Sequence, residues 1–293
     1  MTGRPAPPRP APPRRALPRL AALRRAPLTV LLSALFLAVA VLCALAGPLL
    51  APHALDQDLY LGTVGAGVEG HLSGTDALGR DVLSLAVRGA RSALVGPVVV
   101  AGGSMLVGLL LGTLAGFRGG WLDTVVGRYA DLLLALPAVL LAMVVVGMLG
   151  GGYWVTVLVL VVLFSPTDVR LVRAAVMEQA TRPYIESARV LGIRPGRIML
   201  RHVLPNTAPV AVANALLNTA FAMVALSSLS FLGLGVAPGA ADWGRQLADG
   251  QRVMVDNPLA PVLPGVLIIL AATSVNLLGD WLAERLDRKV AVR

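Results

Sequence analysis

The chain has few of the residue types from which enzyme sites and metal centres are built. It contains one cysteine, Cys43, one lysine, Lys289, and three histidines at positions 53, 71 and 202. A P-loop requires Gly-Lys-Ser/Thr, but Lys289 is followed by Val290, so this lysine forms no ATP site. The scattered histidines and the single cysteine predict no local metal site, disulfide or Cys/His nucleophile. We therefore expect no catalytic residue, cofactor or metal in this chain.

Charge is also scarce. Charged residues make up 14% of the 293, apolar residues make up 56%, and the mean hydropathy is +0.77, as is typical of membrane proteins. A helix needs ~20 apolar residues to cross a hydrocarbon core, and the apolar runs predict six spans, at 28–50, 92–116, 124–149, 153–175, 206–235 and 259–281. The polar end of the fourth span, with Asp168 and Arg170, is expected to project into the cytoplasm. No acidic pair lies deep in a span, which disfavours a proton- or sodium-driven carrier.

The distribution of arginine predicts the orientation, because cytoplasmic segments carry an excess of basic residues. Arginines concentrate before the first span, between spans four and five, and after span six, whereas the loops 51–91 and 236–258 also hold acidic residues. Both termini are therefore predicted to be cytoplasmic and 51–91 extracytoplasmic. Residues 1–27, rich in proline and arginine, are predicted to be a disordered head. The run 28–50 is interpreted as a transmembrane helix rather than a cleaved signal, and 285–293 as a tail.

An arginine-rich stretch, RPYIESARVLGIRPGRIMLRHVLP, occupies 182–205 within the predicted cytoplasmic loop 176–205. Gly192 can end a helix in the left-handed conformation, and Pro195 suits the first turn of a second helix. A helix, a sharp turn and a second short helix on the membrane surface are therefore predicted. A basic interfacial helix that only anchors the chain to anionic headgroups is the alternative. One face of the first helix is predicted to be lined by Tyr184, Ile185, Ala188 and Leu191.

This stretch resembles the EAA loop, by which permease subunits of bacterial ABC importers dock onto their ATPases. Glu186, Ser187 and Ala188 fill the triplet, Gly192 follows after three residues, and Leu204-Pro205 close the motif. Ser187 replaces the first alanine of the family pattern, and His202 replaces its isoleucine. The resemblance implies that ATPase coupling is carried by Glu186, Ser187, Ala188, Gly192, Leu204 and Pro205.

Further segments resemble permeases of dipeptide, oligopeptide and nickel importers, collinearly from about residue 72 to 288. They are TDALGRD at 75–81, RYADLLLALP at 128–137, the 226–250 stretch with Trp243, and NLLGD at 276–280. Locally, Thr75 or Asp76 is predicted to cap a helix, and Arg128 is expected to pair with Asp131. The alternative to a gate at 75–81 is an outer interfacial helix. The resemblance implies an extracytoplasmic gate or receptor contact at Thr75, Asp76, Gly79, Arg80, Asp81 and Trp243.

Polar residues in the last two spans are candidates for lining a pathway. Asn214 and Asn218 are four apart and share a helix face, and Ser227 and Asn276 lie further along. Hydrogen bonding between helices is the alternative, because a buried amide in lipid needs a partner. Glycines at 102, 103, 108 and 112 are expected to mark close helix packing.

Together these features predict an all-α integral membrane protein with six transmembrane helices, five of them in a core at 92–284. The resemblance implies the ABC importer type I permease fold of the second-permease type, in a bacterial inner membrane. It also implies that separate ATPases energise alternating access for di- or oligopeptides. Implied partners are a homologous permease subunit in a heterodimer, two ABC ATPase subunits, an extracytoplasmic substrate-binding protein and membrane lipid, with no nucleic acid. A nickel or metal-chelate permease and, more distantly, a stand-alone carrier or channel remain alternatives.

Overall fold

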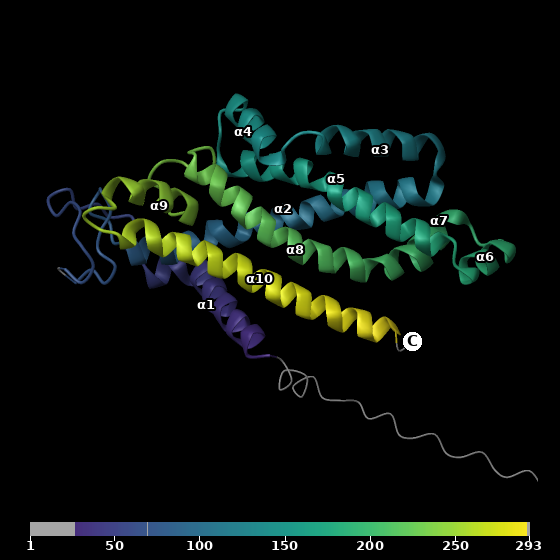
Figure 1. Ribbon diagram of the computed structural model, residues 1–293, viewed down its shortest axis with the longest axis horizontal. Helices are drawn as coiled ribbons and strands as arrows, with labels where there is room; N and C mark the ends of the chain where they lie inside the picture. Colours follow the sequence, from purple (N-terminus) through teal and green to yellow (C-terminus); the bar gives the residue numbers. More distant parts are fainter. Residues whose placement is uncertain (1–26, 69, 292–293) are drawn as a thin grey trace, which may run out of the picture.

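The computed structural model describes residues 27–68 and 70–291, and helices dominate this part of the chain (Figure 1). The predicted disordered head lies outside the described residues, except for Pro27. Extended pairing in the described residues is limited to two isolated bridges. The long helices are α1 (Leu28–Leu50), α2 (Val82–Arg118), α5 (Tyr153–Ala180), α8 (Leu204–Phe231) and α10 (Leu259–Ala291). The shorter ones are α3 (Gly120–Leu134), α4 (Ala138–Met148), α6 (Pro183–Val190), α7 (Pro195–Ile198) and α9 (Trp243–Gly250).

Five of the described helical runs are long and apolar enough to cross a membrane, namely α1, α2, α5, α10 and the run Pro195–Phe231 that contains α8. The third predicted span, 124–149, is instead divided into α3 and α4, which meet at 88°. Pro137 precedes α4 and has an extended backbone. It cannot donate the hydrogen bond that would continue α3, and it disfavours a helical conformation at the residue before it. The predicted third span is therefore not a single helix, and α3 and α4 form a sixth span as a bent pair.

The ends of the helices also depart from the predicted spans. The first span has the predicted bounds, but α2 begins at Val82 rather than at 92, and α10 continues to Ala291. Most of the predicted tail 285–293 is therefore helical. Asp81 explains the early start of α2, because its carboxylate accepts the backbone N–H of Ser84 at 2.7 Å and caps the helix.

Glycines allow α2 and α5 to pack closely. A Cβ added to Gly108 would lie 2.5 Å from the Cβ of Asp168, and one added to Gly112 would lie 2.7 Å from the carbonyl oxygen of Val169. Gly103 is similarly close to a side chain of α5. A Cβ on Gly102 would meet nothing within 4 Å. The predicted role in packing is therefore confirmed for Gly103, Gly108 and Gly112 and was wrong for Gly102.

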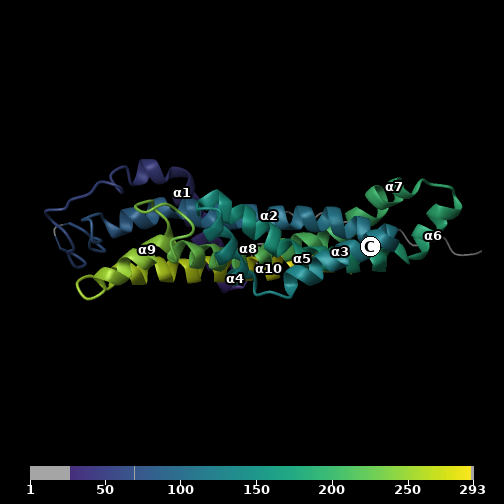
Figure 2. The same cartoon turned by 90° about the horizontal axis from the view of Figure 1, so that it is seen from above.

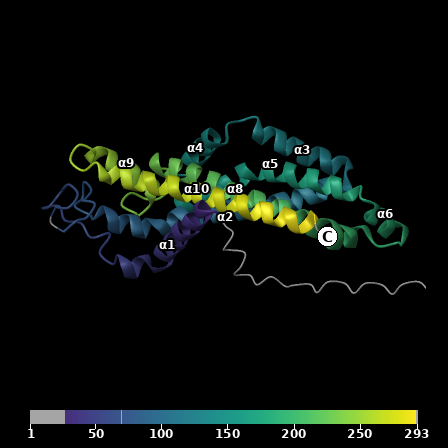
Figure 3. The same ribbon diagram turned by 60° about the horizontal axis from the view of Figure 1, so that its bottom comes forward.

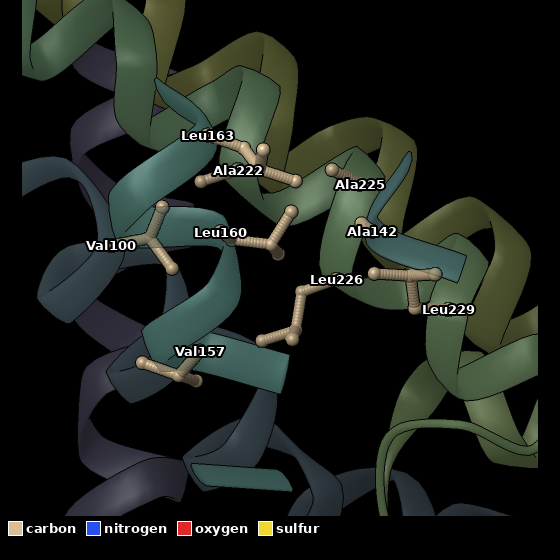
Figure 4. Packing of buried hydrophobic residues seen from close by; sticks show 9 residues of the cluster. All are labelled: Val100, Ala142, Val157, Leu160, Leu163, Ala222, Ala225, Leu226 and Leu229. Atoms are coloured by element: carbon tan, nitrogen blue, oxygen red, sulfur yellow. The ribbon is translucent and has the colours of Figure 1, made fainter. Parts of the chain in front are cut away.

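A buried apolar cluster joins α2, α4, α5 and α8 (Figure 4). Leu160 of α5 and Leu229 of α8 are fully buried in it, and Ala142 fixes the bent α4 against them. Many apolar side chains on the outer surfaces of the helices are exposed, Leu35, Val144 and Phe221 among them. Such surfaces suit contact with lipid or with another subunit.

The two ends of the bundle carry different structures (Figures 1 and 2). At one end the chain leaves the long helices to form α6 and α7. At the other end α9 lies beside the segment that joins α1 to α2. The third view shows α10 crossing the bundle between these ends and α1 lying beside it (Figure 3). The two sequence segments with the strongest motifs thus lie at opposite ends.

Candidate functional site

The segment 182–205 forms the predicted helix, turn and second helix. α6 begins at Pro183, after an extended Arg182, and ends before Gly192, which has a φ of 73°. α7 begins at Pro195. These features confirm the local predictions for Gly192 and Pro195. A π-helical turn, Met199–Val203, then joins α7 directly to α8, a continuity that was not predicted.

A small apolar face anchors α6 and α7 to the bundle. Ile185, Ala188 and Ile198 are buried in a cluster with residues of α2, α5 and α8. The predicted face was only partly right, because Tyr184 is 41% exposed and Leu191 is 77% exposed. Leu191 lies just beyond the last residue of α6, where the helical periodicity no longer applies. The element is therefore fixed against the three long helices through Ile185, Ala188 and Ile198.

The opposite face of this element is exposed. Among the implied coupling residues, Glu186, Ser187, Gly192 and Pro205 are exposed, Leu204 is half-buried and Ala188 is buried. The Ser187 hydroxyl donates to the carbonyl oxygen of Pro183 at 3.0 Å. Val190 is 83% exposed beside Leu191, with arginines around them. An exposed apolar tip rimmed by polar residues is the kind of surface that contacts another protein.

Two ion pairs join α3 to α5 near the same end. Arg170 of α5 contacts Asp131, and Arg173 contacts Asp123. The predicted pairing of Arg128 with Asp131 was wrong. The carboxylate of Asp131 points across to α5, where a guanidinium meets it, rather than along its own helix.

A buried carboxylate links α5 to α8. Asp168 is fully buried, and its Oδ1 accepts the side-chain amides of Asn214 at 2.6 Å and Asn218 at 2.7 Å. The other oxygen, Oδ2, has no hydrogen-bond partner among the described residues. The projection of this part of α5 into the cytoplasm stays a prediction, but Asp168 itself lies buried between helices rather than exposed. The two asparagines do share a face as predicted, and that face meets α5.

Sequence reasoning missed Asp168 as a candidate site residue. The signal was present, because a single carboxylate follows an apolar run and two asparagines stand four residues apart in a later span. A buried acid among membrane helices is expected to have such amide partners. The relative position of α5 and α8 along the bundle, which places Asp168 opposite the two asparagines, could not be predicted from the sequence.

At the other end, residues 75–81 form a turn rather than the predicted first helical turn. Thr75 and Asp81 pair as an isolated bridge, and α2 starts only after Asp81. Asp76 and Arg80 form a buried ion pair at 2.6 Å. Gly79 has a φ of 72°, and a Cβ there would lie 1.9 Å from the carbonyl oxygen of Asp58, so only glycine fits. The prediction that Thr75 or Asp76 caps a helix was wrong.

Long-range hydrogen bonds tie this turn to the segment that surrounds α9. Arg80 donates to the carbonyl oxygen of Gly239 at 2.9 Å, and Asn257 donates to the carbonyl oxygen of Thr75 at 3.0 Å. Trp243 is buried and donates its Nε1–H to the carbonyl oxygen of Ala86 at 2.8 Å. The structure therefore brings the implied gate residues together, but Thr75, Asp76, Arg80 and Trp243 are buried, and Gly79 and Asp81 lie at the same turn.

Asp81 combines the helix cap with a contact to His71. Burial opposes ionisation of its carboxyl group, but hydrogen bonds from Ser84 and His71 outweigh burial and lower the pKa of Asp81. His71 Nδ1 lies 2.9 Å from the Asp81 carboxylate. His53 likewise contacts Asp56. Both histidines of this loop are thus beside carboxylates of the chain itself.

The residues suggested for a pathway do not share one cavity. A groove of about 660 Å³ lies between α8, α9 and α10, and Ser227 lines it together with Phe231, Met254 and Ile269. Asn214 and Asn218 face Asp168 instead. The Oδ1 of Asn276 is buried without a hydrogen-bond partner in the described part of the chain.

A bundle of long apolar helices with an exposed helix, turn and second helix at one end is the architecture of a multi-pass membrane protein. A chain of the inward-facing MetNI methionine ABC transporter shares this fold, with a TM-score of 0.55 and 20% sequence identity, over 69% of this chain and 95% of that chain.

Relatives define the family. Residues 108–292 match the family described as binding-protein-dependent transport system inner membrane component. The chain is 38% identical over 265 residues to the di/tripeptide transport system permease protein DppC of Pseudomonas aeruginosa, across 87% of this chain and 86% of that protein. It is also 38% identical over 221 residues to the glutathione transport system permease protein GsiD of Pectobacterium atrosepticum, across 75% and 73% of the two. This chain belongs to the family of binding-protein-dependent transport system inner membrane components.

Proposed function

We propose that this chain is the transmembrane permease subunit of an ATP-driven importer that moves di- or oligopeptides across the inner membrane. The names of the related permeases support the peptide cargo, since they specify di/tripeptides, dipeptides and glutathione. The single observation that carries the coupling role is the α6–α7 element, with one face buried in the bundle and an exposed apolar tip on the other.

The proposed assembly contains a homologous permease as the heterodimeric partner, two ATPase subunits and an extracytoplasmic substrate-binding protein. In this assembly α6 and α7 face the cytoplasm, as do both termini, and an ATPase contacts Glu186, Ser187 and the residues around Gly192. The buried Ala188 serves to hold α6 in place, and Leu204 and Pro205 set the start of α8. The arginine excess in the loop supports this orientation.

The proposed mechanism is alternating access. An ATPase that moves on binding nucleotide displaces α6 and α7. The displacement reaches α5 and α8, because α5 directly precedes α6 in the chain and α8 follows α7 after the π-helical turn. Asp168 joins α5 to α8 through Asn214 and Asn218, so the two helices move together. Each change of state requires a difference in the binding of nucleotide or loaded receptor between the two states.

At the opposite end we propose that the turn 75–81 shapes the rim that the loaded receptor meets. Its buried ion pair and the bond from Arg80 to Gly239 connect α2 with the segment before α9. The groove lined by Ser227 is the proposed approach to the pathway, and a partner permease would complete it.

Gly192 provides the test of the coupling role. A valine there has open space around its Cβ but must adopt a φ near 73°, which costs a residue with a side chain about 1–2 kcal/mol. The turn between α6 and α7 is therefore expected to change shape while the bundle still forms. In reconstituted vesicles with ATPase and receptor, Gly192→Val should keep ATP hydrolysis and lose most peptide uptake.

Gly196→Val is the matched control, because Gly196 is also exposed with open space around it but has a negative φ within α7. This variant should transport like the wild type. Wild-type uptake by Gly192→Val would refute the coupling role. Uptake without any ATPase subunit would instead indicate a stand-alone carrier, and binding of a nickel chelate but no peptide by the cognate receptor would indicate a metal importer.

A further inference from the structure

A cavity of about 460 Å³ lies at the end of the bundle opposite α6 and α7. Its walls come from the end of α1, the first turns of α2, the start of α5 and the residues just before α9. None of the residues implied in coupling, gating or the pathway lines it. Its size lies within the range of small-molecule sites, ~300–1,000 Å³.

The walls of the cavity carry two positive side chains and no carboxylate. Arg88 and Arg91 are its two ionisable basic residues, and their spacing of three places them on one face of α2. Arg91 makes no ion pair or side-chain hydrogen bond among the described residues, and Arg88 makes only a 3.5 Å contact with the carbonyl oxygen of Pro52. No carboxylate lines the walls. Asp242 follows them in sequence and interacts with the side chain of Ser92 behind the wall, but it is buried and caps α9 by accepting the N–H of Arg245.

The other walls are small, apolar or already hydrogen-bonded. Gly47 and Ala241 leave the space open, while Tyr153 donates its hydroxyl to the carbonyl oxygen of Ser92 at 2.6 Å. Trp154 forms a side of the cavity and is 57% exposed. The site therefore fits an anionic group attached to an apolar body, and its walls offer no carboxylate to an ammonium group carried by the same ligand.

We propose that this cavity binds the head group of an anionic phospholipid, with the phosphate between Arg88 and Arg91. Guanidinium groups match phosphate geometry through paired hydrogen bonds. Tryptophan is enriched where membrane helices meet the lipid–water interface, and Trp154 stands at the first turn of α5. A zwitterionic peptide fits less well, because its ammonium group finds no carboxylate in the walls.

Lipid retention by the purified full-length protein, with the subunits that co-purify, tests the proposal. The protein is exposed to equal amounts of phosphatidylglycerol and phosphatidylcholine, and bound lipid is counted by native mass spectrometry. The wild type should retain phosphatidylglycerol. Each arginine near a membrane surface contributes about a fivefold preference for anionic lipid, so Arg88→Gln/Arg91→Gln should lose roughly 25-fold.

Two further variants keep the result interpretable. Arg88→Lys/Arg91→Lys keeps the charge and should retain most of the lipid even if the glutamine variant folds poorly. Arg252→Gln removes an exposed charge at the same end, outside the cavity, and should retain the wild-type amount. Undiminished phosphatidylglycerol in a folded glutamine variant would overturn the proposal. Displacement of phosphatidylglycerol by a zwitterionic dipeptide would overturn it as well, by showing a cargo site.

Discussion

The buried link between α5 and α8 makes a quantitative prediction at Asp168. Two substitutions distinguish the contribution of its hydrogen bonds to stability from the contribution of its charge. Asp168→Asn keeps an oxygen that accepts both asparagine amides, whereas Asp168→Leu has nearly the same shape but accepts none. The Leu variant leaves the amides of Asn214 and Asn218 without the partners that they have at 2.6 and 2.7 Å.

The expected changes in the free energy of unfolding follow from these contacts. A hydrogen bond between membrane helices contributes about 0.6 kcal/mol on average and ~1.7 kcal/mol at most. Losing two of them in Asp168→Leu should therefore cost roughly 1–3 kcal/mol. Asp168→Asn should cost little, because its amide oxygen can still accept the N–H groups of both asparagines.

Unfolding of the purified protein in mixed micelles, titrated with sodium dodecyl sulfate and followed by circular dichroism, measures both changes. Asn218→Leu and the double variant with Asp168→Leu complete a cycle. The cycle should give a favourable coupling of about 0.6–1.7 kcal/mol between the two side chains. If Asp168→Asn destabilises the protein as much as Asp168→Leu, the charge rather than the hydrogen bonds holds the helices together, and the reasoning fails.

Other contacts predict opposite outcomes for matched substitutions. Gly108→Ala places a Cβ 2.9 Å from a backbone carbon of α5 and should cost about 1–3 kcal/mol, whereas Gly102→Ala meets open space and should gain about 0.5–1 kcal/mol, both measured as shifts in thermal unfolding. Arg80→Ala leaves Asp76 buried without its partner and should cost about 3–5 kcal/mol. Arg182→Ala breaks only an exposed pair and should cost under ~1 kcal/mol, so equal losses in the two arginine variants would refute this account.

The sequence predicted the helices whose signal is an apolar run or a strong terminal residue. The first span was found with its observed bounds. A long apolar run in lipid forms a helix, because only then do its backbone N–H and C=O groups hydrogen-bond to one another. The turn at Gly192 and the start of α7 at Pro195 were also found, since each residue restricts or permits one local backbone conformation. These features depend on neighbours in sequence and need no knowledge of the partners across the bundle.

The features that were missed depend on contacts across the bundle. A helix start was predicted at Thr75 or Asp76, because Asp76 has the chemistry of a cap. Its carboxylate is held by Arg80 instead, and Asp81 caps α2. Asp131 was assigned to the arginine three residues away, and it meets Arg170 of another helix instead. For Asp76 and for Asp131 the sequence contains two possible hydrogen-bond partners. Only the packing of the helices determines which partner each carboxylate meets.

The centre of the bundle is closely packed, whereas its two ends expose apolar surface. Near the centre, Asp168 binds α5 to α8, and glycines bring α2 against α5, so these three helices share a closely packed seam. At the ends, the α6–α7 tip and the groove beside α9 expose apolar surface that the chain itself does not cover. A rigid seam between two uncovered ends transmits a displacement better than a loosely packed bundle would, because close-packed interiors resist compression. The arrangement therefore suits a subunit that is moved at one end by a partner and opens or closes at the other.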